Sequence, residues 1–317
     1  MILAGDIGGT NTRLALFEGD ASSPVRLEIL PTDSAETLLE LVAVFLADDA
    51  DEIAAACFGV AGTVDGGRVA GVNLPWRVDA RELEQGLDVR VQIVNDLQAN
   101  ARGIEALEPS DFALLTSNHV DVDGNRAVVS AGTGLGEAGL FWDGARYHAI
   151  ATEGGHADFA PRSSLEVDLY HYLAAQFGHV SYERICSGAG LVSIYRFLCG
   201  DERRLVDAAS ISAEALAEPS SQSSRALDLF VSIYGARAGN VALGFMATGG
   251  VYLGGGIPPK ILPRLREGGF MHAFRAKGRF VSLLQRVPVR VILNDRAALL
   301  GAARIAAEHS LVPVPTP

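Results

Sequence analysis

The chain has few cysteines and no long apolar run. Only three cysteines, Cys57, Cys186 and Cys199, occur among its 317 residues, and their spacing matches no metal-binding motif. Cysteines this far apart indicate free thiols in a reducing compartment. No stretch reaches the roughly 18 apolar residues that a membrane-spanning helix needs, and no basic segment followed by an apolar run opens the chain. We therefore expect a cytoplasmic protein without a membrane partner.

Positive charge is also scarce. The chain has 26 Lys and Arg against 38 Asp and Glu, which gives a net charge of −12. Nucleic acids and anionic membranes bind basic surfaces, so neither is expected as a partner. Backbone amides and a bound metal ion can still provide the local positive potential that a phosphate group requires. The length is sufficient for two domains, and the 49% hydrophobic content is typical of well-packed cores.

The first 17 residues are typical of an apolar strand, a turn with two glycines and a returning strand. Gly8 and Gly9 allow backbone N–H groups to approach an anion without an intervening side chain. Asp6 ends the first strand, where its carboxylate could hold Mg²⁺ bound to the same phosphates, and Thr10 adds a hydroxyl donor. A plain hairpin turn explains the stretch equally well. No Gly-Lys-Ser/Thr follows, which excludes a Walker A loop, and the returning strand excludes the dinucleotide fingerprint.

The remainder alternates strands and helices, which indicates an α/β fold. Strands are predicted at residues 25–30, 53–60, 89–94, 127–131, 138–142, 251–253 and 289–293. Helices are predicted at residues 34–46 with Ser34 as N-cap, 79–86 with Asp79 as N-cap, 97–107, 165–177 with Gly178 as C-cap, 185–198, 227–246 and 297–307. The glycine turn at 132–136 lies between two strands, as the opening turn does, so we infer an internal duplication.

Four further segments carry polar or glycine residues suited to a site. Asn95 and Asp96 follow a buried strand, and ligands gather beyond the carboxyl ends of strands in open α/β sheets. Glu153 and His156 share a predicted loop, and Glu183 is predicted to open a helix after Ser181. Glycines 254–256 follow a strand. Each segment also has a simple structural explanation. Asn95-Asp96 could be a helix cap, the Glu153–His156 spacing could be incidental, Glu183 could cap a helix, and glycines 254–256 could form a loop.

Taken in order, these segments resemble the bacterial ATP-dependent glucokinase family, over nearly the whole chain from about Leu3 to Ala303. The segments that carry the resemblance are Asp6-Ile7-Gly8-Gly9-Thr10-Asn11-Thr12-Arg13, Asn95-Asp96, Gly132-Thr133-Gly134-Leu135-Gly136, Glu153-Gly154-Gly155-His156-Ala157-Asp158, Ser181-Tyr182-Glu183-Arg184 and Gly254-Gly255-Gly256-Ile257. The loops around Glu153 and Glu183 are the most specific. The opening hairpin alone indicates only the superfamily of sugar kinases, actin and the seventy-kilodalton heat-shock chaperones.

The resemblance implies an α/β, two-domain actin-like (ribonuclease H-like) ATPase fold with the active site in the interdomain cleft. We predict a small domain of residues 1–106 plus 297–317 and a large domain of residues 107–296. ATP and Mg²⁺ are implied as cofactors and glucose as the acceptor. The oligomeric state is not fixed, and the apolar helical second half is compatible with a homodimer.

The resemblance also implies roles for individual residues. Asp96 matches the family's catalytic base. The residues that match the sugar-binding positions are Asn95, Asp96, Glu153, His156 and Glu183, with Asn73 as a weaker match. The residues that match the nucleotide-binding positions are Gly5, Asp6, Ile7, Gly8, Gly9 and Thr10 for one phosphate loop, Thr133 and Gly134 for a second, and Gly254, Gly255 and Gly256 for the adenosine. Asp6 is the candidate Mg²⁺ ligand, acting through water.

The chain departs from related proteins in two respects. It has no cysteine between Cys57 and Cys186, so the zinc loop of many related kinases and repressors, and with it a structural zinc, is not expected. Residues 97–99 differ from the phenylalanine-containing run of the family, which leaves the hexose open. Alternatives are a kinase for another hexose or amino sugar, one using polyphosphate as donor, and a non-catalytic sugar sensor. Asp96 argues against the sensor, because binding alone requires no carboxylate there. Glu153, His156 and Glu183 argue against an assembly or chaperone ATPase.

Overall fold

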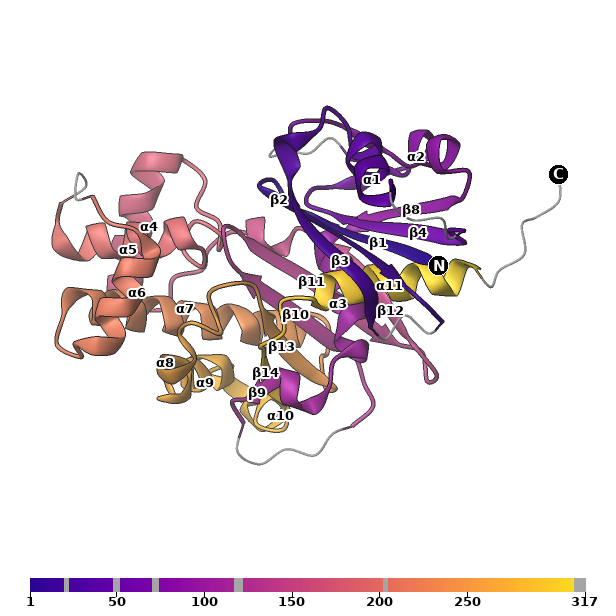
Figure 1. Ribbon diagram of the computed structural model, residues 1–317. Helices are drawn as coiled ribbons and strands as arrows, with labels where there is room; N and C mark the ends of the chain where they lie inside the picture. The colour runs from indigo at the N-terminus through magenta and orange to yellow at the C-terminus, as the bar shows by residue number, and fades with distance from the viewer. Residues whose placement is uncertain (20–22, 48–51, 70–73, 117–121, 202–204, 311–317) are drawn as a thin grey trace. The chain divides into compact units, whose positions relative to one another are not determined.

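The computed structural model describes residues 1–19, 23–47, 52–69, 74–116, 122–201 and 205–310 (Figure 1). These residues form two compact units. Unit 1 comprises Met1–Glu108, His148–Ala151 and the chain from Arg296 onward, and unit 2 comprises Pro109–Tyr147 and Thr152–Asp295. Within the described ranges, no helix combines the length and the apolar character that crossing a membrane requires.

Unit 1 is built on a five-stranded sheet of order β3-β2-β1-β4-β8. Its strands in chain order are β1 (Ile2–Ile7), β2 (Asn11–Phe17), β3 (Pro24–Pro31), β4 (Ala55–Val60) and β8 (Arg90–Asn95). The hairpin β1-β2 is antiparallel, whereas β1, β4 and β8 run parallel. The carboxyl ends of β1, β4 and β8 therefore share one edge, where Asp6 pairs with Gly59 and Val60 pairs with Asn95.

Side chains alternate between the two faces of this sheet, as the period of two requires. On one face, Leu3 and Leu14 pack with helices α1 (Leu38–Leu46) and α2 (Ala80–Leu87). The other face carries smaller side chains such as Ala4 and packs against α3 (Asp96–Gly103) and α11 (Ala297–Ser310). A short sheet of β5 (Val64–Asp65), β6 (Arg68–Val69) and β7 (Val78–Asp79) follows β4.

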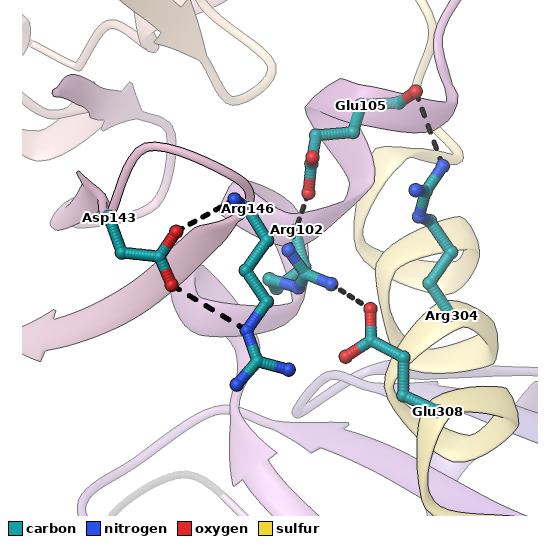
Figure 2. A network of polar contacts seen from close by, with 6 residues as sticks. All are labelled: Arg102, Glu105, Asp143, Arg146, Arg304 and Glu308. Atoms are coloured by element: carbon teal, nitrogen blue, oxygen red, sulfur yellow. Dashed lines mark hydrogen bonds and ion pairs between the residues drawn. The ribbon is translucent and has the colours of Figure 1, made fainter. Parts of the chain in front are cut away.

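Helices α3 and α11 pack closely enough to exclude a side chain between them. A Cβ atom at Gly301 of α11 would lie 1.8 Å from the carbonyl oxygen of Ala99 in α3. An ion-pair network reinforces the contact: Arg102 of α3 binds Glu105 in the 3-10 helix η2 (Ile104–Ala106) and Glu308 of α11 (Figure 2). The buried Arg102 thus fixes the far end of the helix that Asp96 begins.

Unit 2 repeats the strand arrangement of unit 1. Its sheet has the order β12-β11-β10-β13-β14-β9. The strands in chain order are β9 (Phe112–Leu114), β10 (Arg126–Ala131), β11 (Leu135–Trp142), β12 (Tyr147–Thr152), β13 (Gly250–Gly254) and β14 (Val289–Ile292). Again an antiparallel hairpin, β10-β11, continues into parallel strands, β13 and β14. The shared topology agrees with the duplication inferred from the two glycine turns.

Unit 2 is the more helical of the two (Figure 1). Its helices are α4 (Ser164–Phe177), α5 (Gly188–Cys199), α6 (Ala208–Ala217), α7 (Gln222–Gly244), α8 (Leu262–Arg266), α9 (Gly269–Arg275) and α10 (Val281–Leu284). The long helix α7 lies in the core, with Phe230 and Tyr234 fully buried. The Tyr234 hydroxyl donates a hydrogen bond of 2.7 Å to the carbonyl of Val129 in β10, which ties α7 to the sheet.

Three local predictions are wrong at their boundaries. Thr37, not Ser34, caps α1 by accepting a hydrogen bond from the Glu40 N–H, because Ser34 belongs to a separate 3-10 helix, η1 (Thr32–Ser34). The helix after Asp96 ends at Gly103 and continues only as η2. Glu183 opens no helix: it lies in turns before α5, whose N-cap is Ser187.

Candidate active site

The glycine turn between β1 and β2 is exposed and tightly held. The N–H of Gly8 donates to the carbonyl of Asn11 at 3.1 Å, and the Thr32 hydroxyl donates to the carbonyl of Gly8 at 2.7 Å. Gly9 and Thr10 are exposed, whereas Gly5 and Ile7 are buried in β1. An anion at this turn would therefore meet backbone N–H groups and the Thr10 hydroxyl, and Ile7 can contribute only its backbone.

Asp6, the penultimate residue of β1, lies opposite Arg13 of β2. Arg13 Nη1 lies 3.1 Å from Asp6 Oδ2, and the Asp6 side chain is 19% exposed. A single carboxylate suits Mg²⁺, which binds proteins through one or two carboxylates and keeps waters and substrate phosphates as its other ligands. Asp6 therefore fits the proposed water-mediated magnesium site. Within the described ranges, no group of three or more His, Cys, Asp or Glu side chains could hold a metal ion by itself.

Asn95 and Asp96 stand where β8 passes into α3. The Asn95 carboxamide caps the helix: its oxygen accepts from the N–H of Leu97 at 2.9 Å, and its nitrogen donates to the carbonyl of Gly62 at 3.0 Å. One amide hydrogen remains for another partner. Asp96 is the first residue of α3 and is partly exposed. Two strand spacings, about 10 Å, separate the ends of β1 and β8 along the sheet edge, so Asp96 and the Gly8 turn belong to the same edge of unit 1.

In unit 2, two loops bring Glu153, His156 and Glu183 together. Glu153 precedes the 3-10 helix η4 (Gly154–His156), His156 is its last residue, and both are exposed. The Glu183 N–H donates to the carbonyl of Gly155 at 2.9 Å, and His156 Nδ1 lies 3.9 Å from Glu183 Oε1. The imidazole of His156 and the carboxylate of Glu183 thus lie close together, and Glu153 precedes the same 3-10 helix. Carboxylates and an imidazole can accept from and donate to the hydroxyls of a sugar.

The remaining glycine loops adjoin these residues or each other. The Leu135 N–H, next to Gly134, donates to Glu183 Oε2 at 3.1 Å. The N–H of Ile257 donates to the carbonyl of Ala131 at 3.1 Å, which brings glycines 254–256 beside the turn at 132–136. Gly255 has a φ of +81°, and a Cβ there would lie 2.3 Å from the oxygen of Ala131, so only glycine fits this turn.

A buried ion pair next to these loops was not predicted from the sequence. Glu137 of β11 and Arg237 of α7 form a bidentate pair, with Nε–Oε1 and Nη2–Oε2 distances of 2.6 and 2.7 Å. Arg237 also packs on the ring of Tyr182, and burial raises the pKa of that phenol. Each residue is a charged side chain within an otherwise apolar strand or helix. Because buried charges are usually paired, this pattern could have indicated a buried ion pair.

The structure distributes the predicted site residues over both units. Unit 1 holds the Gly5–Thr10 hairpin with Asn95 and Asp96. Unit 2 holds Glu153, His156 and Glu183 with the two glycine loops. Asn73 lies outside the described residues. Within each unit the predicted residues converge at a shared sheet edge or loop cluster, although they are far apart in sequence.

A family model and near full-length relatives match this chain. The profile of the Glucokinase family matches residues 3–309. A glucokinase from Synechocystis sp. is 38% identical over 346 residues, covering 96% of this chain and 98% of the relative. The crystal structure of a glucokinase from an Antarctic psychrotroph is 30% identical, with a TM-score of 0.86, and the match covers 97% of this chain and 98% of that one.

A more distant structure shows the fold. A ROK family glucokinase from Streptomyces griseus, solved in complex with glucose and AMPPNP, has a TM-score of 0.68 at 20% identity. The match covers 97% of this chain and 99% of that one. These likenesses confirm the predicted α/β fold of the actin-like ATPase class.

Proposed function

The chain belongs to the glucokinase family, and we propose that it transfers the γ-phosphoryl group of ATP to the 6-hydroxyl of glucose with Asp96 as the general base. The observation that carries this proposal is the shared edge of the unit 1 sheet. There, the partly exposed carboxylate of Asp96 follows β8, and the exposed glycine turn with Thr10 follows β1. Phosphoryl transfer requires these two elements, a base for the acceptor hydroxyl and backbone donors for the phosphates.

In the reaction, Asp96 takes the proton of the 6-hydroxyl while that oxygen attacks the γ-phosphorus. The bond from the γ-phosphorus to the bridging oxygen breaks, and ADP leaves with the electron pair. The N–H groups of the Gly8 turn and the Thr10 hydroxyl hold phosphate oxygens. Asp6 would hold Mg²⁺ through water, and the bound ion would neutralise the charge of the phosphates. A positioned base of this kind typically contributes about 10²–10⁴-fold to the rate.

Glucose is held, in this proposal, by Asn95 of unit 1 and by Glu153, His156 and Glu183 of unit 2. The carboxylates accept hydrogen bonds from hydroxyls, while the remaining amide hydrogen of Asn95 donates. A sugar lacking one hydroxyl would leave one of these groups unpaired and would be rejected. Thr133 and Gly134 contact a phosphate group, and glycines 254–256 contact the adenosine. The glucose and AMPPNP in the Streptomyces griseus structure support these two substrates.

The finer organisation follows from the same proposal. We propose a small domain of residues 1–106 with 297–317 and a large domain of residues 107–296. The described thiols of Cys57, Cys186 and Cys199 are free, which suits a reducing cytoplasm. Assembly as a homodimer is part of the proposal and is tested by analytical ultracentrifugation.

The direct test is a coupled assay of ADP formation with ATP, Mg²⁺ and a panel of hexoses. Asp96→Asn removes the base and is expected to lower kcat by about 10²–10⁴-fold while glucose still binds in calorimetry. The matched control is Asp88→Asn, an exposed position with a φ of +54° that asparagine tolerates. Glucose binding without ADP formation in the wild type would favour the sensor, and preference for another hexose would change only the substrate.

A further inference from the structure

Arg237 makes three kinds of contact with one guanidinium group. Its Nε and Nη2 bind both oxygens of Glu137, and the two side chains are 13% and 2% exposed. Nη2 also donates to the carbonyl oxygen of Gly154 at 2.7 Å. The central carbon of the group, Cζ, lies over the ring of Tyr182, 4.7 Å from its centroid. The guanidinium group of Arg237 therefore binds Glu137, Gly154 and Tyr182 at the same time.

The contact with Gly154 fixes the loop that carries Glu153 and His156, which we call the first sugar loop. Gly154 follows Glu153 directly, and its carbonyl is held by the guanidinium. The fit is close enough that a Cβ at Gly154 would lie 2.2 Å from Glu137 Oε2 and 2.9 Å from Arg237 Nη2. The backbone of Gly154, at the start of η4, therefore packs directly against the Glu137–Arg237 ion pair. This pair is buried between β11 and α7.

The contact with Tyr182 fixes the loop that carries Glu183, which we call the second sugar loop. Tyr182 precedes Glu183, and its hydroxyl accepts a hydrogen bond from Asn240 Nδ2 of α7 at 3.1 Å. Its N–H donates to the carbonyl of Ala157 at 3.1 Å. One helix therefore holds the first loop through Arg237 and the second through Arg237 and Asn240.

We propose that Arg237 is a positioning residue for the hexose site, which sets the spacing of Glu153 and Glu183 by clamping Gly154 and Tyr182 with one planar group. The inference rests on the proposed function of the same site. Arg237 acts on the sugar-binding side chains through their neighbours, the carbonyl of Gly154 and the ring of Tyr182. Lysine cannot replace it, because an ammonium group offers neither the bidentate edge nor the stacking face.

Arg264 provides the matched control. Its side chain is 11% exposed, close to the 13% of Arg237, and it also belongs to unit 2. It forms ion pairs with Asp228 and Glu267 and donates to the hydroxyl of Ser224, none of which is a predicted site residue. Arg264→Lys therefore disturbs a partly buried arginine network of the same kind without touching either sugar loop.

The experiment compares Arg237→Lys and Arg264→Lys in the full chain. The measurements are the KM for glucose and for ATP, the preference for glucose over 2-deoxyglucose in kcat/KM, and the Tm. We expect Arg237→Lys to raise the KM for glucose about tenfold or more, the effect of losing one charge-assisted hydrogen bond. We expect the KM for ATP to change less than the KM for glucose, since Arg237 contacts the sugar loops directly and the turn at 132–136 only through Glu183 and its bond to Leu135. The preference for glucose should fall. Arg264→Lys should lower the Tm alone.

Tyr182→Leu tests the clamp from its other side, and remains informative if Arg237→Lys folds poorly. It removes the stacking face, so it should raise the KM for glucose too. Its effect should be less than additive with that of Arg237→Lys, because both remove one contact. An unchanged KM for glucose in Arg237→Lys, or equal changes in the Arg264→Lys control, would overturn the inference while glucose turnover stands. A wild-type chain that phosphorylates no hexose would overturn the proposed function itself.

Discussion

The carboxylate of Glu183 accepts a hydrogen bond from the backbone N–H of Leu135 at 3.1 Å. This bond joins a residue proposed to bind glucose to the turn proposed to bind a phosphate of ATP. The other oxygen, Oε1, lies toward His156. One carboxylate therefore faces both substrates in the proposed site, and changes at Glu183 should separate its two roles.

Glu183→Gln keeps an acceptor for the Leu135 N–H but loses the charge, whereas Glu183→Ala loses both. We expect Glu183→Gln to raise the KM for glucose by about 10- to 100-fold, the value of a hydrogen bond to a charged group, with little change in the KM for ATP. Glu183→Ala should raise both constants, because the turn at 132–136 is released. Steady-state kinetics measure the two constants separately. Equal KM values for ATP in the two variants would show that the Leu135 bond is without consequence for the nucleotide.

The adjacent glycines 255 and 256 should respond differently to alanine. Gly255→Ala forces a side chain into a left-handed conformation against the oxygen of Ala131, and we expect a loss of about 2–4 kcal/mol in the free energy of unfolding. No heavy atom lies within 4 Å of a Cβ at Gly256. Gly256→Ala should therefore preserve stability and raise the KM for ATP, since Gly256 is proposed to contact adenosine. Urea denaturation and ATP kinetics check the pair, and an unchanged KM for ATP in Gly256→Ala would remove Gly256 from the proposed nucleotide site.

Gly301→Ala should separate α11 from α3. The added methyl group would overlap the backbone of Ala99, and overpacking typically costs about 1–3 kcal/mol. Because Asp96 begins α3, we also expect a lower kcat at temperatures where the variant is fully folded. The control is Gly244→Ala at the end of α7, where no atom lies within 4 Å of the new Cβ. Denaturation in urea together with kcat distinguishes the two, and equal stabilities would contradict the close contact.

Lys277 should make stability depend on pH above neutrality. Burial, and then the charges of Arg162 and Arg237, lower its pKa from the ordinary 10.5 to about 8, against the opposing effect of Glu166. Between these two pKa values the unfolded chain holds a proton that the folded chain has released, so this lysine's contribution to stability rises with pH from about 8 to 10.5. Below pH 8 both states are protonated, and the folded state bears the full electrostatic cost.

Lys277→Met removes this titration. The variant should be more stable than the wild type at pH 7, and the difference between them should shrink as the pH rises from 8 to 10.5. Chemical denaturation at several pH values measures the difference, in which the contributions of other groups cancel. A difference that is constant over this range would show that Lys277 titrates normally.

Elements with strong local signals were predicted from the sequence. The two glycine hairpins, the cap at Asp79 and the C-cap at Gly178 all occur as expected. Strands β9 and β12 were missed because β9 has only three residues and β12 does not alternate regularly between buried and exposed positions. Helices α8 to α10 were missed because Pro263, Gly268 and Gly278 interrupt any helical pattern.

In the candidate site, too, local motifs were predicted and contacts between distant residues were not. Residues in recognisable motifs, such as Asp96 and Glu183, were singled out from the sequence, and their roles stay predictions. The Glu137–Arg237 pair was not found, because its members are 100 positions apart and no local pattern links them. A contact between distant side chains depends on how strands and helices pack, which the spacing of residues along the chain does not encode.

The return of α11 to the first sheet has a consequence for synthesis on the ribosome. Strands β1, β2 and β4 emerge first, but the core on one of their faces is completed only by residues of α11. At translation rates of about 5–20 residues per second, that face waits roughly 15–60 s for its covering helix. Apolar residues such as Phe17 stay uncovered meanwhile, while unit 2 is synthesised in full. The nascent chain therefore exposes an apolar sheet face during this interval, which makes it prone to aggregation until α11 is made.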